Sequence, residues 1–456
     1  MIKADGEIYK GDFLDGKKNG RGKLVFVNGD IYKGQWENNK KTGQGKYEYS
    51  NGDIYDGSWV DNSKNGFGKY IYINGNIYEG EWKKDSINGN GKYLYSNGDN
   101  YDGEWLKNLR SGTGKYVNIN GNIYEGEWLF DRRNGSGKTL YSNGDVYDGY
   151  WKDDMKNGIG NYTDRNGGIK EGMWESDKLI GQSTISFTGG DFYEGESVDD
   201  KREGKGKITY TNGDVYDGEW KNDKRDGTGR YYSANGELYI GDWKEGRKCG
   251  NGDKWFANND HYEGKWENDQ FNGEGVHKSG NGDVYTGGFK NGLKSSQGKK
   301  EYCNGGSYEG NWANDMKNGQ GIYEHSNGEI YEGEFKNGLM HGYGLYEGIG
   351  AYYEGEWIND KRSGKGKMVY DNGSEYIGEF KGDKKHGYGK YTYENGDVYT
   401  GRFVKGKRHG RGSILVTGSQ NLIENDWKND EPVNDDYDQK ITNNSSGNKG
   451  TNDDED

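Results

Sequence analysis

Proline, cysteine and long apolar runs are almost absent from this chain of 456 residues. Its one proline, Pro432, leaves a long β-ladder uninterrupted, because proline cannot donate to ladder hydrogen bonds. Two cysteines, Cys249 and Cys303, cannot make a disulfide framework, which favours a reducing compartment. No apolar run is long enough to span a membrane, and none follows Met1 as in a signal peptide. We therefore expect a cytoplasmic protein that is not secreted.

Aliphatic residues are scarce as well, since hydrophobic residues make up only 29% of the chain. Such a polar composition is usual in disordered chains. However, 14% of the residues are aromatic, with 40 Tyr and 14 Trp. These numbers predict an ordered chain that is organised around regularly placed rings rather than around an aliphatic core.

The rings recur in one phrase, Tyr-x-Gly-x-Trp/Phe. Its Tyr position runs from Tyr9 to Tyr331 in steps of 23 residues and continues at Tyr353, Tyr376 and Tyr399. Of 18 full copies, only Lys170 lacks the Tyr and only Ser197 lacks the ring that follows. This regularity predicts tandem repeats, each a single supersecondary unit.

Each copy carries the signals of a β-hairpin. Tyr55, Gly57 and Trp59 alternate and so share one face of a strand, as do Tyr78, Gly80 and Trp82 in the next copy. We expect a polar loop to follow and to end in Gly66-x-Gly68, before a short strand leads into Asn-Gly. Gly57 is interpreted as bare backbone under packed rings; a binding notch is the alternative.

The Asn-Gly connection has two possible lengths. A two-residue Asn51-Gly52 turn would put Tyr47 on the face opposite Tyr55. A three-residue loop with Gly52 in a left-handed bulge would place Tyr47 opposite Tyr55, so that all the rings share a face. It would also bring opposite charges together across strands, and we favour it. The favoured charge pairs are Lys46–Asp56, Lys69–Glu79, Lys92–Asp102, Lys115–Glu125 and Lys138–Asp148, with Lys23 opposite Lys33 as a counterexample.

Consecutive hairpins should pair edge to edge. The predicted fold is all-β, an elongated single-layer antiparallel ribbon of about 18 tandem 23-residue hairpin repeats over residues 1–429, with a degenerate capping repeat at 413–429. Residues 430–456 abandon the pattern. They hold nine acidic residues and two lysines, and we expect an acidic disordered tail.

The pattern breaks in three places. Lys170, Ser183 and Ser197 replace a Tyr, a Gly and a Trp, which predicts a bend or soft point near residues 165–200. One residue and the Asn-Gly turn are lost at 347–350. Only Met1 to Lys3 precede the first turn, so we expect an unfinished edge strand with which another chain could pair, or which frays.

The phrase, followed by His/Asn-Gly-x-Gly, resembles the MORN (membrane occupation and recognition nexus) repeat, and residues 336–344 lie close to the family consensus. The resemblance covers residues 1 to about 429. It implies an elongated β-hairpin protein that organises cytoskeletal, ciliary or membrane-apposed structures, often as an oligomer. Some members are linked to phosphoinositide head groups.

Several kinds of chemistry are disfavoured. A nucleotide loop needs a following helix, but Gly43-x-Gly45 precedes a predicted strand. We interpret His341, His386 and His409 as loop residues, and the one repeat between His386 and His409 is too far for a shared metal. A single-layer ribbon offers no deep, dry cavity for catalysis, and the acidic balance disfavours nucleic acid. We expect no cofactor, no metal and no catalytic residue.

The favoured function is a non-catalytic scaffold that presents its aromatic face and one edge of polar loops to protein partners, with self-association as an added expectation. Aromatic surface that stacking leaves uncovered could accept an extended or helical segment of a partner. One alternative is a membrane-surface adaptor that binds anionic phosphoinositide head groups through loop cations such as Lys201-Arg202, Lys361-Arg362 and Lys384-Lys385. Another is a regulatory module for a separate enzyme. Location in the cytoplasm, at cytoskeleton or cilium, or peripherally at a membrane follows from the resemblance.

Overall fold

A computed structural model of the chain describes residues 6–419 and 421–433. These residues form β-strands and turns, and no helix occurs among them, so none could cross a membrane. The chain divides into two compact units, unit 1 (residues 1–234) and unit 2 (residues 235–456), which are described separately. The predicted all-β architecture is confirmed in both.

Unit 1 contains twenty strands among its described residues. They are β1 (Ile8–Leu14), β2 (Lys17–Val25), β3 (Ile31–Glu37), β4 (Lys40–Glu48), β5 (Ile54–Val60), β6 (Ser63–Ile71), β7 (Ile77–Lys83), β8 (Ser86–Leu94), β9 (Asn100–Leu106), β10 (Leu109–Val117), β11 (Ile123–Leu129), β12 (Arg132–Leu140), β13 (Val146–Lys152), β14 (Met155–Thr163), β15 (Ile169–Glu175), β16 (Lys178–Ser186), β17 (Phe192–Val198), β18 (Lys201–Thr209), β19 (Val215–Lys221) and β20 (Lys224–Tyr232).

Unit 2 contains eighteen described strands. They are β21 (Leu238–Lys244), β22 (Arg247–Trp255), β23 (His261–Glu267), β24 (Gln270–Lys278), β25 (Val284–Lys290), β26 (Leu293–Glu301), β27 (Ser307–Ala313), β28 (Met316–Glu324), β29 (Ile330–Lys336), β30 (Leu339–Gly348), β31 (Ala351–Ile358), β32 (Lys361–Tyr370), β33 (Glu375–Lys381), β34 (Lys384–Thr392), β35 (Val398–Val404), β36 (Lys407–Leu415), β37 (Leu422–Lys428) and β38 (Glu431–Pro432).

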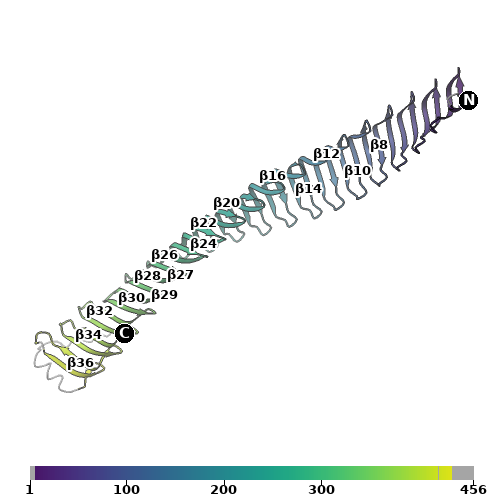
Figure 1. Cartoon of the computed structure of the whole chain (residues 1–456). Coiled ribbons are helices and arrows are strands. Elements are labelled where there is room, and N and C mark those ends of the chain that lie inside the picture. The colour runs from purple at the N-terminus through teal and green to yellow at the C-terminus, as the bar shows by residue number, and fades with distance from the viewer. Residues whose placement is uncertain (1–5, 420, 434–456) are drawn as a thin grey trace. The chain divides into compact units, whose positions relative to one another are not determined.

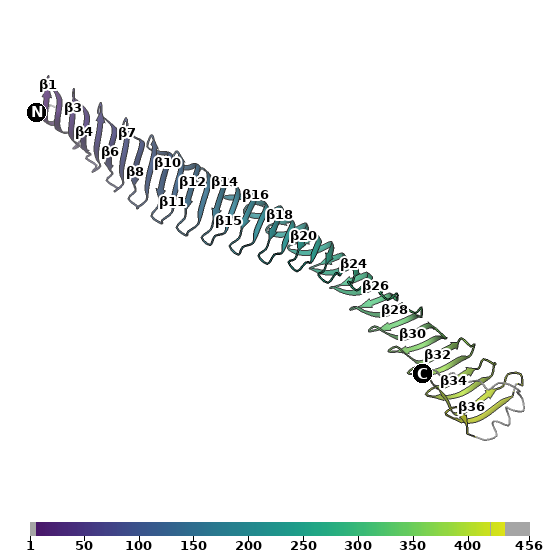
Figure 2. The same cartoon turned by 180° about the vertical axis from the view of Figure 1, so that it is seen from behind.

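Within each unit, every strand pairs antiparallel with the next, and Figures 1 and 2 show the strands side by side in a single layer. Two-residue turns such as Asp61-Asn62, with φ of 48° and 70°, lie along one edge of each ladder, here called the turn edge. Loops such as Tyr49 to Asp53 lie along the other, called the loop edge. Each hairpin thus contacts only its neighbours, as in other repeat proteins.

The three-residue loop predicted at Asn51-Gly52 is confirmed. Tyr47 pairs with Tyr55, and Gly52 has a φ of 97°. The amide of Tyr49 donates to the Asp53 carbonyl oxygen at 2.9 Å, and the amide of Gly52 donates to the Tyr49 carbonyl oxygen at 3.0 Å. All five predicted charge pairs stand opposite each other, and Lys23 does face Lys33.

The predicted polar loop ending in Gly-x-Gly is wrong, because β6 begins at Ser63 and contains Gly66 and Gly68. Gly57 pairs with Gly68 and Trp59 with Lys64, so three residues of β6 face one residue of β5. Gly66 takes up this bulge with a φ of 93°. The same correction applies to His341, His386 and His409, which lie in β30, β34 and β36 rather than in loops.

The core of each unit is a single column of rings on one face of the ladder, here called the ring column. Tyr55 is 0% exposed and Trp59 is 2% exposed, although no second layer covers them. The ring of Tyr55 meets the ring of Trp59 edge-on at 5.2 Å and the ring of Trp82, in the next hairpin, at 5.4 Å. The rings therefore bury one another along the ladder.

The polar atoms of the ring column are satisfied by the backbone. The Tyr55 hydroxyl donates to the Ser58 carbonyl oxygen at 2.9 Å, and the indole N–H of Trp59 donates to the Gly45 carbonyl oxygen at 2.9 Å. Both rings lie on glycine. A Cβ on Gly68 would stand 2.3 Å from the Tyr55 hydroxyl oxygen, and one on Gly57 would stand 2.4 Å from the Gly68 Cα. Bare backbone is thus what lets the rings approach the sheet.

The last described hairpin extends slightly past the predicted end of the repeats. β38 pairs with β37, and the Val433 amide donates to the Asp426 carbonyl oxygen at 2.8 Å. Residues 430–433 therefore belong to the ladder, although we expected the tail to begin at 430. Residues 434–456 and Met1 to Lys3, the expected unfinished edge, lie outside the described residues. The connection at 347–350 is one residue shorter than in the other repeats. There Ile349 and Gly350 form a two-residue turn between β30 and β31.

We predict that Gly68→Ala lowers the stability of the array by about 1–3 kcal/mol, because the new methyl group must displace the Tyr55 ring. Urea unfolding followed by tryptophan fluorescence measures this change. Gly189→Ala is a matched control, since a Cβ at Gly189 would meet nothing within 4 Å. Equal losses in both variants would contradict the packing of Tyr55 on Gly68.

Candidate interaction surfaces

The ring face is closed rather than available to a partner. A row of cations lies over the rings near the turn edge. The Lys64 amine stands 4.5 Å from the Trp82 ring centre, and the Arg110 guanidinium carbon stands 4.1 Å from that of Trp128. The Arg110 guanidinium also pairs with Asp131 at 3.2 Å. We expected uncovered ring surface to accept a partner segment, but rings and cations already fill this face.

Of the adjacent cation pairs that suggested lipid binding, only one residue of each pair belongs to the row of cations over the rings. In Lys201-Arg202, Lys361-Arg362 and Lys384-Lys385, the second residue turns toward the rings of its own or a neighbouring hairpin. The first residue of each pair is exposed on the turn edge. Only half of these loop cations are therefore available to an anionic ligand.

Burial in the ring column changes the acid–base behaviour of its members. Burial raises the pKa of Tyr55 well above its usual value. Burial also raises the pKa of Tyr47, together with the hydrogen bond that Tyr47 donates to the Asp30 carboxylate at 2.7 Å. In the cation row, burial lowers the pKa of Lys41 to about 8. The folded state therefore requires neutral phenols.

The three sequence breaks at Lys170, Ser183 and Ser197 are a single coupled change. Ser183 holds the repeat position that Gly45 holds in an earlier hairpin. At Gly45, the Tyr32 ring fills the place of a Cβ, and the Trp59 indole N–H donates to the Gly45 carbonyl oxygen. A side chain at this position leaves no room for a Tyr ring at 170. The Ser183 hydroxyl hydrogen-bonds that of Ser197 at 2.7 Å, and both residues are buried.

Other side chains take over the space around this break. Leu179 is 0% exposed, and the amine of Lys170 pairs with the Asp200 carboxylate at 3.2 Å. Strand pairing continues from β14 to β18 without a gap. The ring column is interrupted while the ladder is not, and a bend or soft point at 165–200 remains a prediction.

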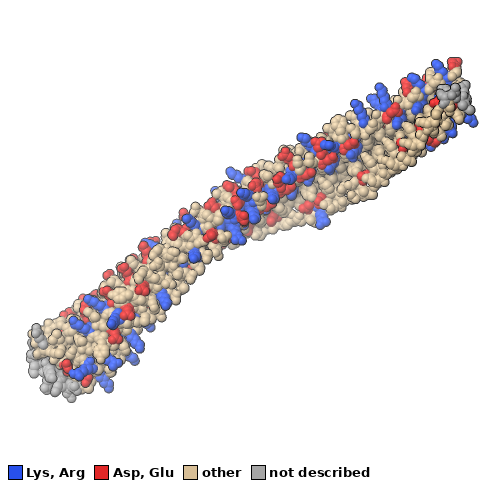
Figure 3. Space-filling model, viewed as in Figure 1, with Lys and Arg blue, Asp and Glu red and all other residues tan. Residues whose placement is uncertain are grey.

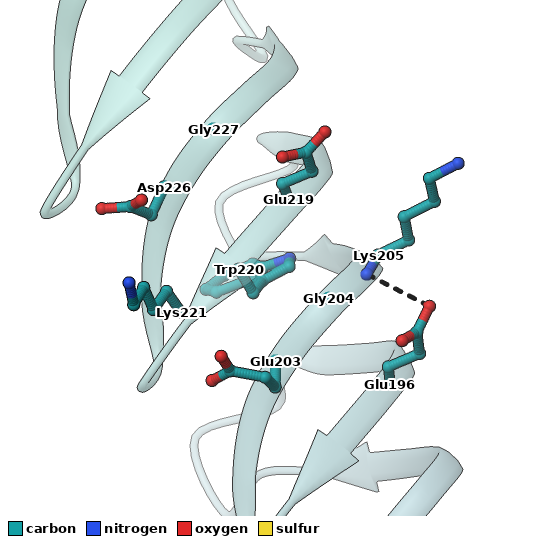
Figure 4. Close-up of a pocket in the computed structure, with 9 residues that line it drawn as sticks. All are labelled: Glu196, Glu203, Gly204, Lys205, Glu219, Trp220, Lys221, Asp226 and Gly227. Carbon is teal, nitrogen blue, oxygen red and sulfur yellow. Dashed lines mark hydrogen bonds between the residues drawn. The ribbon is translucent and has the colours of Figure 1, made fainter.

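An open hollow of about 500 Å³ lies nearby in unit 1, among β17 to β20. Its lining includes Glu196, Glu203, Glu219 and Asp226, with Lys205 and Lys221. Figure 4 shows that the four carboxylates point in different directions, and the Lys205 amide donates to the Glu196 carboxylate at 3.4 Å. The described residues contain no group of three or more His, Cys, Asp or Glu that could hold a metal ion.

The face opposite the rings in unit 1 carries an apolar row that the sequence reasoning missed. Two of its stretches run without a break across four consecutive strands each, here called the outer row: Ile54, Ile71, Ile77 and Leu94, then Val117, Ile123, Leu140 and Val146. Ile71 is 36% exposed, Leu94 45% and Leu140 42%. The signal was present, because an aliphatic residue precedes nearly every Tyr of the phrase in this part of the chain.

A row of alternating charges flanks the outer row on the same face. Its exposed ion pairs are Lys69–Glu79 at 3.6 Å, Lys92–Asp102 at 3.2 Å, Lys115–Glu125 at 3.7 Å and Lys138–Asp148 at 3.5 Å. Exposed pairs of this kind contribute little to stability. In unit 2 charged residues interrupt the corresponding apolar row at Lys278, Glu301, Glu324 and Glu347. Apolar stretches across four strands therefore occur in unit 1, whereas in unit 2 Val398, Leu415 and Leu422 form a stretch across three.

The tandem hairpins, the ring column and the glycine positions under it define a β-hairpin repeat protein. The family model described as MORN repeat matches 17 stretches of the chain, so the chain belongs to the MORN repeat family. The matched residues are 9–31, 32–54, 55–77, 78–100, 101–123, 124–146, 147–169, 193–215, 216–237, 239–261, 262–284, 285–307, 308–330, 331–348, 353–375, 376–398 and 399–415. The unmatched copy, 170–192, is the one that begins at Lys170 and contains Ser183.

No curated protein sequence matches the chain. Among solved structures, it is similar to the TCP10 domain of Danio rerio CPAP in complex with a peptide of Danio rerio STIL, at 15% identity and a TM-score of 0.22, over 52% of this chain and 93% of that one. It is also similar to the SAS-4 (dCPAP) TCP domain of Drosophila melanogaster in complex with a proline-rich motif of Ana2, at 19% identity and a TM-score of 0.19, over 39% and 85%.

The tyrosine pKa values predict loss of the fold at alkaline pH. The unfolded chain ionises its phenols near pH 10, whereas burial raises the pKa of Tyr55, Tyr78 and Tyr101 in the folded state. Their contribution to stability is complete below about pH 10 and is lost as pH rises further. Phenolate absorbance and circular dichroism, titrated together, should show the ring-column phenols ionising only as the strands unfold. Ionisation of these phenols before any loss of strand signal would contradict their burial.

We also predict that Ser197→Trp alone destabilises the chain, because Ser197 is fully buried and hydrogen-bonded to Ser183, so an indole must displace its neighbours. The triple variant Lys170→Tyr, Ser183→Gly, Ser197→Trp should instead raise the thermal midpoint and slow proteolysis between 165 and 200. Thermal unfolding and limited proteolysis measure both effects. A single variant as stable as the triple one would show that the three positions are independent.

Proposed function

We propose that the chain is a non-catalytic scaffold whose unit 1 binds protein partners through the outer row. The observation that carries the proposal is the continuous half-exposed apolar row beside alternating charges on a face that no described residue covers. Contiguous exposed apolar surface in soluble proteins commonly marks an interaction site. Partner binding would remove this surface from water, which is favourable by about 25 cal/mol per Å².

The spacing of the outer row favours a helical segment as the bound element. Neighbouring strands lie about 4.8 Å apart, and one turn of an α-helix rises about 5.4 Å. An amphipathic helix laid along the row would therefore meet about one apolar side chain per strand over four strands. The alternating charges beside the outer row would favour a helix whose polar side chains carry the complementary charges.

The finer parts of this proposal come from the family. Scaffolding of cytoskeletal, ciliary or membrane-apposed structures in the cytoplasm, and self-association, are what MORN repeats imply. The alternative functions are a phosphoinositide adaptor, which the exposed first cations of the turn-edge pairs support, and a regulatory module for another enzyme. Liposome flotation with and without phosphoinositide separates the adaptor from the scaffold.

The outer row predicts which substitutions separate partners from the chain. Ile71→Lys with Leu94→Lys should remove the partners that proximity labelling recovers with the natural chain, and circular dichroism should remain unchanged because both residues are exposed. Ile322→Lys is the control, since Ile322 is 46% exposed on the same face of unit 2 but pairs with Glu309 and Glu332 rather than with apolar residues. Loss of the same partners in the control, or of none in the double variant, would contradict binding at the outer row.

A further inference from the structure

The turn edge of the last hairpins of unit 2 carries a group of lysines that lack the acidic neighbours found elsewhere. The group, called here the C-terminal lysine cluster, comprises Lys361, Lys381, Lys384, Lys405 and Lys407. All five are exposed, and none forms an ion pair with a carboxylate of the described residues. Figure 3 shows basic side chains gathered at this end of unit 2, on the face that it displays.

The reason lies in the repeat itself. At several places elsewhere on the turn edge, a cation that begins a strand pairs with an acid in the turn of the following hairpin, 21 residues later, whereas Lys201 and Arg247 meet Asn222 and Asn268 there. Lys40 meets Asp61 at 3.0 Å, Arg132 meets Asp153 at 3.3 Å and Lys178 meets Asp199 at 3.2 Å. After Lys361 and Lys384, the corresponding positions are Gly382 and Lys405. Lys361 and Lys384 therefore have no acid at the pairing position, and Lys405 adds a further positive charge.

Three of the four acids on these turns are already engaged, and the fourth, Glu431, stands opposite Lys428 in the last hairpin. Asp383 pairs with Arg362 at 3.2 Å, and Asp430 pairs with Arg408 at 3.3 Å. The Asp360 carboxylate accepts the Met340 amide at 2.8 Å. Adjacent hairpins are about 10 Å apart, which is close to the Debye length at physiological salt. Salt therefore screens much of the repulsion between lysines of neighbouring turns, and the cluster as a whole remains an unneutralised positive patch.

We propose that the acidic segment 434–456 of the same chain binds the C-terminal lysine cluster. This segment has seven acidic residues against two lysines. Its first acids, Asp435, Asp436 and Asp438, follow Val433 by two to five residues, a reach of about 7 to 18 Å for an extended chain. Val433 itself lies in the hairpin beside Lys405 and Lys407, since Asp430 in that hairpin pairs with Arg408.

The second acidic group, 453–456, extends the contact. A chain of about 20 residues spans roughly 25 Å on average. Counted from the hairpin of Val433, this distance includes the turn of Lys384, two hairpins or about 20 Å away, whereas the turn of Lys361 lies about 30 Å away. Occupied in this way, the cluster is closed to other anions, and a competing polyanion must displace the segment first. This contact uses a different surface from the outer row and does not depend on it.

Zero-length carbodiimide crosslinking of the full chain tests the contact, because it joins only carboxylates and amines in direct reach. Mass spectrometry should find Asp435, Asp436 or Asp438 joined to Lys405 or Lys407 within one molecule, and the links should disappear at high salt. A mixture of isotope-labelled and unlabelled chains separates links within a molecule from links between molecules. Links only between molecules, no links, or equal links to Lys84 and Lys107 on the turn edge of unit 1 would overturn the proposal.

Binding of inorganic polyphosphate measures the competition. Asp435→Asn, Asp436→Asn, Asp438→Asn should bind polyphosphate several-fold more tightly than the natural chain. Adding Lys405→Ala and Lys407→Ala should abolish that gain, whereas the matched pair Lys84→Ala and Lys107→Ala should leave it intact. Unchanged polyphosphate affinity in the triple asparagine variant would show that the segment does not occupy the cluster.

Discussion

The structure depends on one contact, the ring of a tyrosine lying flat on two glycines of paired strands. Tyr55 lies on Gly57 and Gly68, and the next Trp packs against its exposed side. The contact buries large aromatic surface without a second layer, which explains how a chain with 29% hydrophobic residues can fold. It also explains the abundance of glycine, because any larger residue would push the ring off the sheet.

The break at Lys170, Ser183 and Ser197 supports the dependence of the rings on glycine, because the rings are missing where the glycine is missing. One side chain added at Ser183 coincides with the loss of the Tyr ring that would have lain on it and of the Trp ring at 197. The backbone ladder continues through the break, held by strand hydrogen bonds, Leu179 and the Lys170–Asp200 ion pair. The family model passes over the same copy. Ring packing and strand pairing are thus separable, and the rings hold most of the sequence signature.

Much of the fold could be predicted because the repeat applies the same constraint many times. The period, the shared face of Tyr55 and Trp59 and the loop at Gly52 follow from alternation and turn chemistry. The position of Gly66 and Gly68 inside β6 could not be predicted, because Gly-x-Gly is typical of a loop. In the structure Gly66 forms a β-bulge, and Gly68 lies under the Tyr55 ring. The closure of the ring face could not be predicted either, because alternation shows which residues share a face but not whether rings can cover themselves.

Because the rings cover one face, partners are left with the outer row and the two edges, and this is the central claim. Hydroxyl-radical footprinting of the natural chain in solution tests it most directly. The account predicts that Trp59 and Trp82 are protected in the free chain and that Ile71 and Leu94 react as exposed side chains do, despite the lower intrinsic reactivity of aliphatic groups. Trp59 and Trp82 reacting as they do in the unfolded chain, with Ile71 and Leu94 protected, would contradict it.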